Sequence, residues 1–357
     1  MIGKVPPPFG GVSVHTGRLA CYAGVKGWRV RVFDFSKREK FRFAQNVTVY
    51  PFGVHSPFAL VRILCSRSII HFHGGPWFLW CFFGFLGLLG RKVLLGVHPS
   101  DWLVVSYARK HVFKRWLFRA CCRGFSCVAV PHKWVEQVVS GLGLPFRKIV
   151  RMNSNFIPPV SRSQNHEAVP NEVWDFVKDH SPVLGGCGYR LNFKDGIDVY
   201  GLDLLIPLIH RLRHSDFPNS GVVFVLPHVD NYAYFNELKR MIKELNVEKH
   251  ILFVHGERKA YPVWPHLDVF IRPTLVDAGS FSVRECLCVG IPVVASDCVE
   301  RPKEVVTFKC RDLEDLEDKV KIVLGQVEKY RVKNCKSSAD DFIKLYEQLA
   351  GLNHVAS

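Results

Sequence analysis

At 357 residues with 48% apolar content, the chain is too long for one ordinary hydrophobic core, and the sequence predicts two domains. The formal net charge is +16, and residues 1–160 alone hold 23 Lys and Arg against 4 Asp and Glu. A basic first part beside a near-neutral remainder predicts an anionic partner for the first part only: anionic lipid, a phosphorylated acceptor or nucleic acid.

The 12 cysteines are predicted to be reduced thiols of a cytosolic protein, many of them in the core. They form no CxxC pair and no Cys/His spacing typical of a metal site. Cys121 and Cys122 are adjacent, and Cys286 and Cys288 are two positions apart. A structural zinc site is the less favoured alternative. No signal peptide is recognised at the N-terminus.

The first elements follow the order of a Rossmann-like unit. A short strand at about 2–5 leads into Pro6–Pro8 and Gly10–Gly11, where the glycines permit a tight loop. A helix is expected over about 13–25, and the alternating apolar residues of WRVRVFDF, 28–35, predict the next strand. Further elements are expected to be a strand at 47–50, a helix near 57–64 and a strand at 69–73.

Residues 76–90, PWFLWCFFGFLGLLG, are the most apolar run. A bilayer-spanning helix needs about 20 residues, so this run is too short to cross a membrane. It is expected to be a buried helix or a segment that dips into lipid. VLLGVHPSD then predicts a strand that ends in His98, with Asp101 three residues on.

Residues 103–123 predict a basic amphipathic helix in which aromatic side chains interleave with Lys and Arg. This combination is typical of helices that lie in a membrane interface, where each basic residue contributes about 1 kcal/mol near an anionic leaflet. The alternative is the solvated, charged face of an ordinary helix. A strand, helix and glycine stop follow in 126–143, and a strand leading to Asn153–Asn155 closes the domain.

The domain boundary is expected after Pro158–Pro159, because the stretch that follows is polar. The sequence therefore predicts four parts: a first domain at 1–160, a linker at 161–180, a second domain at 181–335 and a C-terminal helix at 336–357 that packs back on the first domain.

The second domain begins with Val183 and Leu184, which lead into a glycine-rich loop, and a helix starts near Gly201. Short buried strands are expected at 222–227 and 251–256. Together with the helix between them they indicate a second doubly wound sheet.

The stretch DVFIRPTLVDAGSFSVRECLCVGIPVVASD, 268–297, predicts a strand, a loop, a helix closed by Gly290 and another parallel strand. Asp277 falls in the loop and Glu285 on the helix. Ligands of open α/β sheets bind at the carboxyl ends of strands, so both carboxylates are expected at a binding site.

This stretch resembles the donor-binding signature of glycosyltransferase family 4, a group of retaining enzymes with the GT-B fold. GT-B proteins have two Rossmann-like, doubly wound parallel-sheet domains that face a cleft. The family pattern is an acid, a glycine-containing loop, seven intervening residues, a Glu, and a later GxPVV run; here it stands as D-AGSFSVR-E and GIPVVASD. Asp277 stands where the family usually has Glu.

The resemblance implies a role for each matched residue on the donor side. Glu285 would accept hydrogen bonds from the nucleotide ribose, and Asp277 from sugar hydroxyls. Backbone amides at Gly279, Ser280, Phe281 and Ser282 would surround the sugar. Arg190 would hold the diphosphate, as a guanidinium neutralises a phosphate leaving group without a metal.

Two further donor-side positions are implied by the same resemblance. The family's second phosphate-binding Lys aligns with Tyr200, and Lys194 is the nearest cation to it in this loop. Gly10 and Gly11 match the family's opening loop near the donor phosphate.

On the acceptor side, the resemblance places His98 at the reaction centre and His73 at a strand end on the acceptor side of the cleft. His71 and His73 could instead pack in the core. Enzymes of this class have no clear side-chain nucleophile, so none is assigned.

These observations predict a retaining hexosyltransferase that moves a sugar from a nucleotide diphosphate sugar to an acceptor hydroxyl. No metal or other cofactor is expected. The charge and the apolar run predict a lipid-linked or glycan acceptor at an anionic membrane surface, in polysaccharide, lipopolysaccharide or glycolipid synthesis. The expected location is cytoplasmic, peripheral at the inner face of the membrane.

Three other functions are weighed against this one. A GT-B sugar-nucleotide epimerase would have no use for a basic, aromatic first domain. A nucleic-acid-binding protein is disfavoured because the charge lies beside long apolar runs and no RNA or DNA motif is present. A catalytically inactive scaffold is disfavoured by the presence of Asp277, Glu285 and Arg190.

Overall fold

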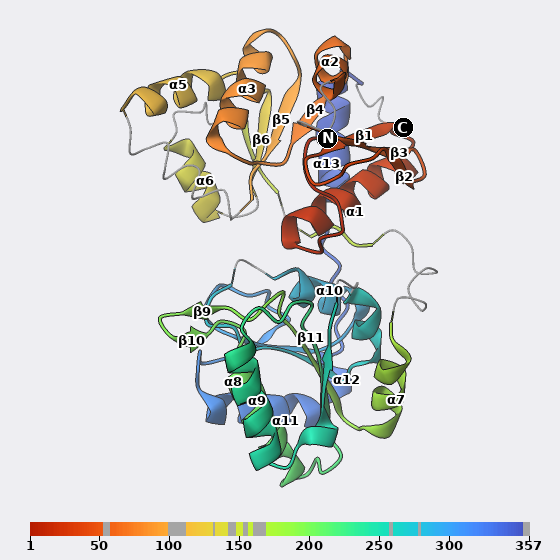
Figure 1. The fold of residues 1–357 in the computed structure, drawn as a ribbon, viewed down its shortest axis with the longest axis vertical. Coiled ribbons are helices and arrows are strands. Elements are labelled where there is room, and N and C mark those ends of the chain that lie inside the picture. Colours follow the sequence, from red (N-terminus) through yellow and green to blue (C-terminus); the bar gives the residue numbers. More distant parts are fainter. Residues whose placement is uncertain are drawn as a thin grey trace. The chain divides into compact units, whose positions relative to one another are not determined.

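The computed structural model describes the chain except residues 53–57, 99–111, 131–132, 142–147, 153–155, 160–168, 257–259, 278–279 and 353–357. The chain divides into two compact units. Unit 1 comprises Met1–Val160 and Lys336–Ser357, and unit 2 comprises Ser161–Cys335. Each unit is an α/β structure built on its own, mainly parallel, sheet (Figure 1).

The sheet of unit 1 has strands in the orders β2-β3-β1 and β4-β5-β6-β7, and only β2 runs antiparallel to its neighbour. Ile2 joins the two parts, because it pairs in parallel with both Phe33 and Phe72. The strand expected at 2–5 is therefore a bridge of one residue. Its extension is blocked by Pro6–Pro8, which lack the backbone N–H groups that a ladder needs.

The strands and helices of unit 1 begin and end close to the apolar runs of the sequence. Its strands are β1 (Val30–Asp34), β2 (Phe41–Ala44), β3 (Val47–Pro51), β4 (Ile70–Phe72), β5 (Val93–Gly96), β6 (Cys127–Val130) and β7 (Ile149–Arg151). Its helices are α1 (Gly11–Val25), α2 (Phe58–Cys65), α3 (Trp77–Leu88), α5 (Val112–Cys122), α6 (Lys133–Ser140) and α13 (Ala339–Ala350).

Alternating residues of the strands in unit 1 supply two separate cores. Val93 and Leu95 of β5 pack in the core that also contains side chains of α3 and α5. Leu94 packs in the other core, with α1 and α13. The last helix of the chain thus completes the hydrophobic core of the unit that holds the N-terminus.

Unit 2 is a six-stranded, fully parallel sheet in the order β12-β11-β8-β13-β14-β15. These strands are β8 (Val183–Cys187), β11 (Gly221–Val225), β12 (Ile251–Val254), β13 (Val269–Arg272), β14 (Val293–Ser296) and β15 (Val306–Phe308). A small antiparallel hairpin, β9 (Phe193–Lys194) and β10 (Ile197–Asp198), stands apart from the sheet.

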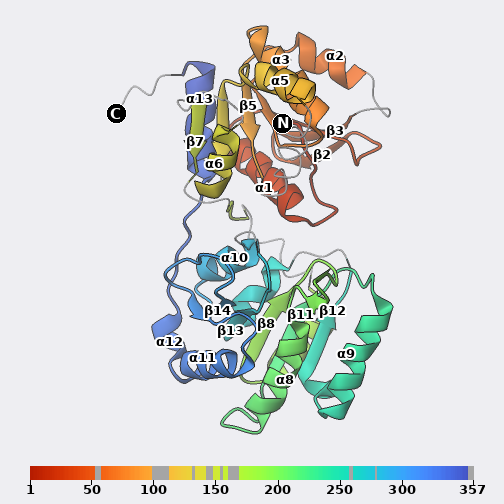
Figure 2. The same ribbon diagram turned by 90° about the vertical axis from the view of Figure 1, so that its left-hand side faces the viewer.

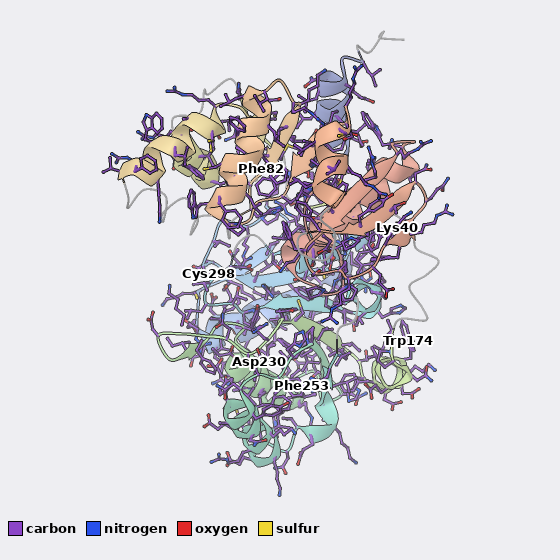
Figure 3. The ribbon with its side chains drawn as sticks, turned by 45° about the horizontal axis from the view of Figure 1, so that its top comes forward. Lys40, Phe82, Trp174, Asp230, Phe253 and Cys298 are labelled. Carbon is purple, nitrogen blue, oxygen red and sulfur yellow. A yellow bond between two sulfur atoms is a disulfide. The ribbon has the colours of Figure 1, made fainter. Side chains whose placement is uncertain are left out.

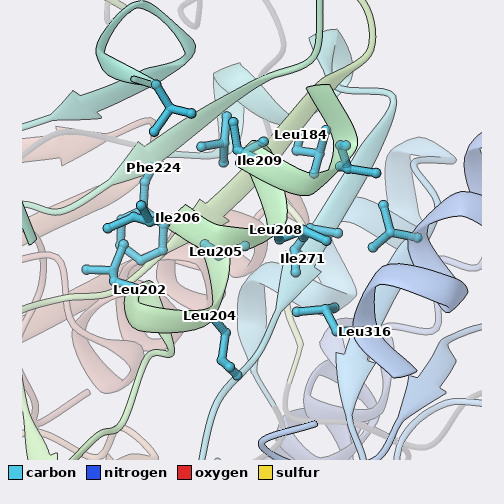
Figure 4. Packing of buried hydrophobic residues seen from close by; sticks show 14 of the residues in the cluster. Leu184, Leu202, Leu204, Leu205, Ile206, Leu208, Ile209, Phe224, Ile271 and Leu316 are labelled. Atoms are coloured by element: carbon cyan, nitrogen blue, oxygen red, sulfur yellow. The ribbon is translucent and has the colours of Figure 1, made fainter. Parts of the chain in front are cut away.

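Helices cover both faces of this sheet. Leu184 and Phe224 pack with α8 on one face, where α9 and α11 also contribute (Figure 4). Phe270 and Val293 pack on the other face with α7, η5 and α10. The elements are α7 (Asn171–Asp179), α8 (Leu202–Arg213), α9 (Tyr232–Glu244), α10 (Phe281–Val289), α11 (Leu313–Gly325), α12 (Val327–Tyr330) and the 3₁₀ helices η4 (Glu248–His250) and η5 (Tyr261–His266).

The structure differs from the sequence expectations at three places in unit 2. Residues 171–179, expected in a linker, form helix α7, because Val173 and its apolar neighbours pack against the sheet. The glycine-rich loop begins later than expected, since Gly185 and Gly186 lie inside strand β8. Cys288 forms a disulfide with Cys335, so the expectation of reduced thiols is wrong for this pair.

Candidate active site

The strand β13, helix α10 and strand β14 form the unit that the sequence predicted. Ser280 caps the start of α10 by accepting a hydrogen bond from the Val283 amide, and its hydroxyl lies 2.7 Å from that of Ser282. Gly290 ends the helix at φ 81°, a left-handed conformation that glycine adopts without strain. Phe281 is the first residue of the helix. Gly279, expected to be near the donor, lies outside the described residues.

Asp277 lies between two guanidinium groups. Its Oδ2 atom accepts a hydrogen bond from Arg272 Nε at 3.1 Å and another from Arg301 Nη1 at 2.9 Å. Burial alone would raise the pKa of Asp277, but the two arginines lower it well below its usual range. The side chain of Asp277 is 5% exposed, so this carboxylate is an ionised, buried partner of two cations.

Glu285 is buried within the first turns of α10, and its position is fixed by a second element. Its Oε2 atom accepts a hydrogen bond of 2.7 Å from the indole Nε1 of Trp264, which belongs to η5. Trp264 itself is fully buried and packs edge-on against Phe270 of β13. A carboxylate can accept about four hydrogen bonds, so this contact orients the group without exhausting its capacity for a ligand.

Arg190 lies on the loop after β8, as expected. Its guanidinium pairs with Asp230, which is labelled in Figure 3, at 2.8 Å. Both side chains are about half exposed. It also lies 5.2 Å from the ring centroid of Tyr189. Lys194 is exposed on the β9–β10 hairpin. An exposed ion pair of this kind contributes little to stability, so a diphosphate could replace Asp230 at low cost.

Four histidines lie buried together in unit 1. His15 comes from α1, His71 and His73 from the end of β4, and His98 from the segment after β5. His73 Nδ1 lies 3.4 Å from His98 Nε2, and the Nδ1 atom of His71 lies 2.7 Å from the hydroxyl of Tyr346 in α13. The structure thus brings together both acceptor-side candidates of the sequence, in a cluster that sequence reasoning did not anticipate.

Three of these imidazoles, those of His71, His73 and His98, are neutral near neutral pH. Burial and neighbouring cationic groups hold the pKa of His71 and of His73 well below the usual range. Burial, with His15 as a smaller cause, lowers the pKa of His98 to about 3. The imidazole of His98 therefore offers one N–H donor and one acceptor, and no charge.

Gly10 and Gly11 begin helix α1 of unit 1. Gly10 is the N-cap, and its amide donates a 2.9 Å hydrogen bond to the hydroxyl of Ser13, which is a residue of the helix. The helix starts at Gly11, two residues before the expected start.

Helices α3 and α5 pack closely (Figure 2). Both helices carry exposed apolar side chains. A Cβ atom at Gly84 would lie 2.4 Å from the carbonyl oxygen of Cys121, so the two backbones touch. We name the α3–α5 surface by its exposed apolar residues: Phe78, Phe85, Leu88, Leu89, Val112, Phe113 and Trp116. Half-buried Phe82 lies on α3 with the first three of these residues (Figure 3), and Leu89 caps the end of that helix.

Cations accompany the α3–α5 surface. Arg115 and Arg119 are exposed on α5, and the ammonium of Lys114 lies 5.6 Å from the ring centroid of Trp77. The predicted basic helix at 103–123 is described from Val112 onward, and residues 99–111 lie outside the described part. No helix in the described part is long and apolar enough to cross a bilayer.

The main contributors that sequence reasoning missed are Arg272, Arg301, Trp264 and His15. A signal existed for Arg272, because an arginine that ends an apolar strand in front of Pro273 stands at the ligand-binding edge of a sheet. Neither Trp264 nor Arg301 belongs to a local pattern, since each reaches its partner from a different element. In the described residues, no group of three or more His, Cys, Asp or Glu side chains could hold a metal ion.

The two parallel-sheet units define the GT-B fold, and comparison with solved structures agrees. A glycosyltransferase of Rickettsia africae ESF-5 superposes with a TM-score of 0.66 at 14% identity, over 99% of this chain and 98% of that one. HepE of Anabaena, in complex with UDP and glucose, superposes with a TM-score of 0.61 at 14% identity, over 99% and 96%. These likenesses establish the fold alone.

Sequence comparison adds a match confined to the second unit. Residues 197–324 match the family model of glycosyl transferases group 1. The lipopolysaccharide core biosynthesis mannosyltransferase LpsB of Rhizobium meliloti is 27% identical over 147 residues, which are 40% of this chain and 37% of LpsB. The chain thus spans well under half of this curated relative. The matches support a GT-B glycosyltransferase and leave family 4 membership open.

Proposed function

We propose that the protein is a glycosyltransferase that moves a hexosyl group from a nucleoside diphosphate sugar to an acceptor hydroxyl. The observation that carries this proposal is Glu285, a buried carboxylate held by Trp264 at the carboxyl edge of the parallel sheet. It lies inside the segment that matches the group 1 family model. A fixed acceptor at that edge suits the hydroxyls of a ribose.

The remaining residues would act on the reacting groups. Arg190 would exchange Asp230 for the diphosphate and neutralise the charge of the leaving group, which needs no metal. His98 would contact the transferred sugar from unit 1 as a neutral imidazole. Retention of configuration, as in family 4, is part of this proposal.

A nucleoside diphosphate should therefore raise the stability of the wild-type protein, and Glu285→Ala should lose about half of this effect at a hundred times the wild-type Kd. A ligand that binds only the folded state contributes about 2.7 kcal/mol at a hundred times its Kd. Each lost hydrogen bond costs about 0.5–1.5 kcal/mol, so the variant should bind roughly tenfold more weakly. A thermal-shift panel of UDP, GDP and ADP, followed by calorimetry, measures both.

The matched control for that experiment is Glu237→Ala, which removes an exposed glutamate of α9 in the same unit. Its affinity for the nucleotide should equal that of the wild type. Unchanged affinity in Glu285→Ala would remove the ribose assignment. Conversion of the free nucleotide sugar to an epimer without an acceptor would favour the epimerase instead.

We further propose that the acceptor is lipid-linked and that the α3–α5 surface docks on the anionic cytoplasmic face of a membrane. Trp116 is 67% exposed, although large aromatic side chains are usually covered in soluble proteins. Arg115 and Arg119 stand on the same helix, and unit 1 carries most of the positive charge. LpsB, which acts in lipopolysaccharide core synthesis, is consistent with such an acceptor.

The protein should sediment with anionic vesicles, sediment less with neutral ones, and be released by high salt. Electrostatic attraction weakens as the Debye length falls from about 10 Å at 0.1 M to about 3 Å at 1 M. The double variant Phe113→Ser/Trp116→Ser should bind more weakly, whereas Tyr232→Ser, an exposed aromatic of unit 2, should not. Equal binding to both vesicle types, unaffected by salt, would favour a soluble anionic glycan as acceptor.

A further inference from the structure

Arg272 ends strand β13 at the edge of the sheet where the site lies. Its Nε atom donates to Asp277 at 3.1 Å and its Nη1 atom to the carbonyl oxygen of Cys187 at 2.8 Å. The guanidinium is therefore anchored to the ends of two neighbouring strands, β8 and β13. Its side chain is 11% exposed, which leaves part of it accessible to a ligand.

Asp277 is shared by Arg272 and Arg301, so two cations contact one carboxylate directly. Arg301 is 2% exposed, and it donates to the carbonyl oxygen of Ser296 as well as to Asp277. The other carboxylate of this site, Glu285, is engaged by Trp264. Buried charge is stable only when it is compensated, and among the described residues the contacts named here give the two guanidinium groups one shared carboxylate.

Tyr200 stands where the resemblance to family 4 would place a second phosphate-binding cation. Its ring centroid lies 5.4 Å from the guanidinium carbon of Arg272, within the range of a cation–π contact. The position where family 4 has a cation is thus occupied by an aromatic ring. The guanidinium of Arg272, at the end of β13, lies over that ring.

The guanidinium of Arg272 has hydrogen-bonding capacity left. An arginine has five N–H donors in a fixed fork. Among the described residues, the Nε atom of Arg272 donates to Asp277 and its Nη1 atom donates to the carbonyl oxygen and, at 3.8 Å, to the sulfur of Cys187. Its Nη2 atom makes one long contact, 3.5 Å to Asp277. One N–H group of Nη2, on a partly accessible cation, is therefore left at the end of a parallel strand, where anionic ligands bind.

We propose that Arg272 is the second cation of the donor diphosphate site, in the role that the lysine has in family 4. Asp277 and Tyr200 are then positioning residues that hold the guanidinium toward the phosphates. This assignment rests on the proposed function. It gives Asp277 an indirect role in place of the sugar contact that the resemblance implies.

The test compares ligands with and without phosphates on the full chain. Binding of UDP, GDP, ADP, their nucleosides and inorganic pyrophosphate is measured by calorimetry for the wild type and for Arg272→Gln. The variant should bind the diphosphate ligands roughly tenfold or more weakly and the nucleosides unchanged, because charge-assisted hydrogen bonds to phosphate are lost. Arg211→Gln, which removes an arginine paired with Glu317 on the outer helices of the unit, should match the wild type.

A conservative variant separates charge from folding. Arg272→Lys keeps the positive charge and should retain most of the preference for diphosphates over nucleosides. If the Lys and Gln variants lose this preference equally, or lose nucleoside and diphosphate affinity in parallel, Arg272 is structural and the proposal is overturned.

The remaining outcomes distinguish this inference from the proposed function. Tight nucleoside diphosphate binding that is unchanged in Arg272→Gln overturns the inference and leaves the function standing. Pyrophosphate binding that depends on Arg272, without any nucleotide binding, supports the inference and overturns the function. No binding of nucleotide or pyrophosphate by the wild type overturns both.

Discussion

Replacing Asp277 with alanine should lower the free energy of unfolding by about 3–5 kcal/mol. The change would leave the buried guanidinium groups of Arg272 and Arg301 without their shared counter-charge, and a buried charge that loses its partner keeps its full desolvation cost. Asp277→Asn, which keeps the shape and removes the charge, should cost most of the same amount. Urea unfolding of the full chain, with hydrogen exchange of β13 and α10 amides, measures the loss in unit 2.

A matched control for this prediction is Asp203→Ala. Asp203 pairs with Arg311 in the same unit, but both side chains are about one quarter exposed. Solvent screens this pair in part, so this variant should lose clearly less stability than Asp277→Ala. If Asp277→Ala lowers the free energy of unfolding no more than Asp203→Ala does, solvent compensates the charges of Arg272 and Arg301.

The elements that the sequence predicted well are those with a local cause. The apolar run of β13, the amphipathic turn of α10 and the stop at Gly290 all depend on residues within a few positions of one another. Glu285 could therefore be placed on its helix, and Asp277 in the loop before it, from spacing alone. The order of strands and helices also indicated two doubly wound sheets, and the resemblance to family 4 implied the GT-B fold.

The features that could not be predicted depend on contacts between distant residues. Arg301 meets Asp277 across 24 positions, and Cys288 meets Cys335 across 47. No periodic pattern in the sequence indicates contacts between residues so far apart along the chain. Gly185 and Gly186 were predicted in a loop for a different reason, because a residue without a side chain adds nothing to an apolar pattern. They lie in β8, one of the two central strands of its sheet.

The histidine cluster shows the same limit. The resemblance to family 4 placed His98 at the reaction centre and His73 on the acceptor side, and each of them follows a short apolar strand. The sequence could not show that His15 would join them from α1, or that Tyr346, near the C-terminus, would bind His71. Burial also lowers the pKa of His71, His73 and His98, so these three imidazoles are neutral near neutral pH.

His98→Ala should lower kcat about a hundredfold while the affinity for the nucleoside diphosphate changes little. Small displacements at a reaction centre cost rates of that order, and in the proposed function His98 orients the sugar rather than binding the nucleotide. Its contact with His73, at 3.4 Å, and its burial fix the ring in one orientation. Steady-state kinetics with the acceptor, together with calorimetry of the nucleotide, separates the two effects.

The control for His98→Ala must disturb the same cluster without touching the reacting groups. Tyr346→Phe removes only the hydroxyl that contacts His71, so it should cost about 1 kcal/mol of stability and leave kcat unchanged. The pH profile gives a second criterion. The pKa of His98 is lowered to about 3, so its imidazole is neutral throughout the range from about pH 6 to 8. The ratio of wild-type to mutant kcat should therefore stay constant over that range. A change in this ratio with a midpoint near pH 6.5 would mean that His98 has the pKa of a solvent-exposed imidazole. A kcat of His98→Ala close to that of the wild type would mean that His98 is only a core residue.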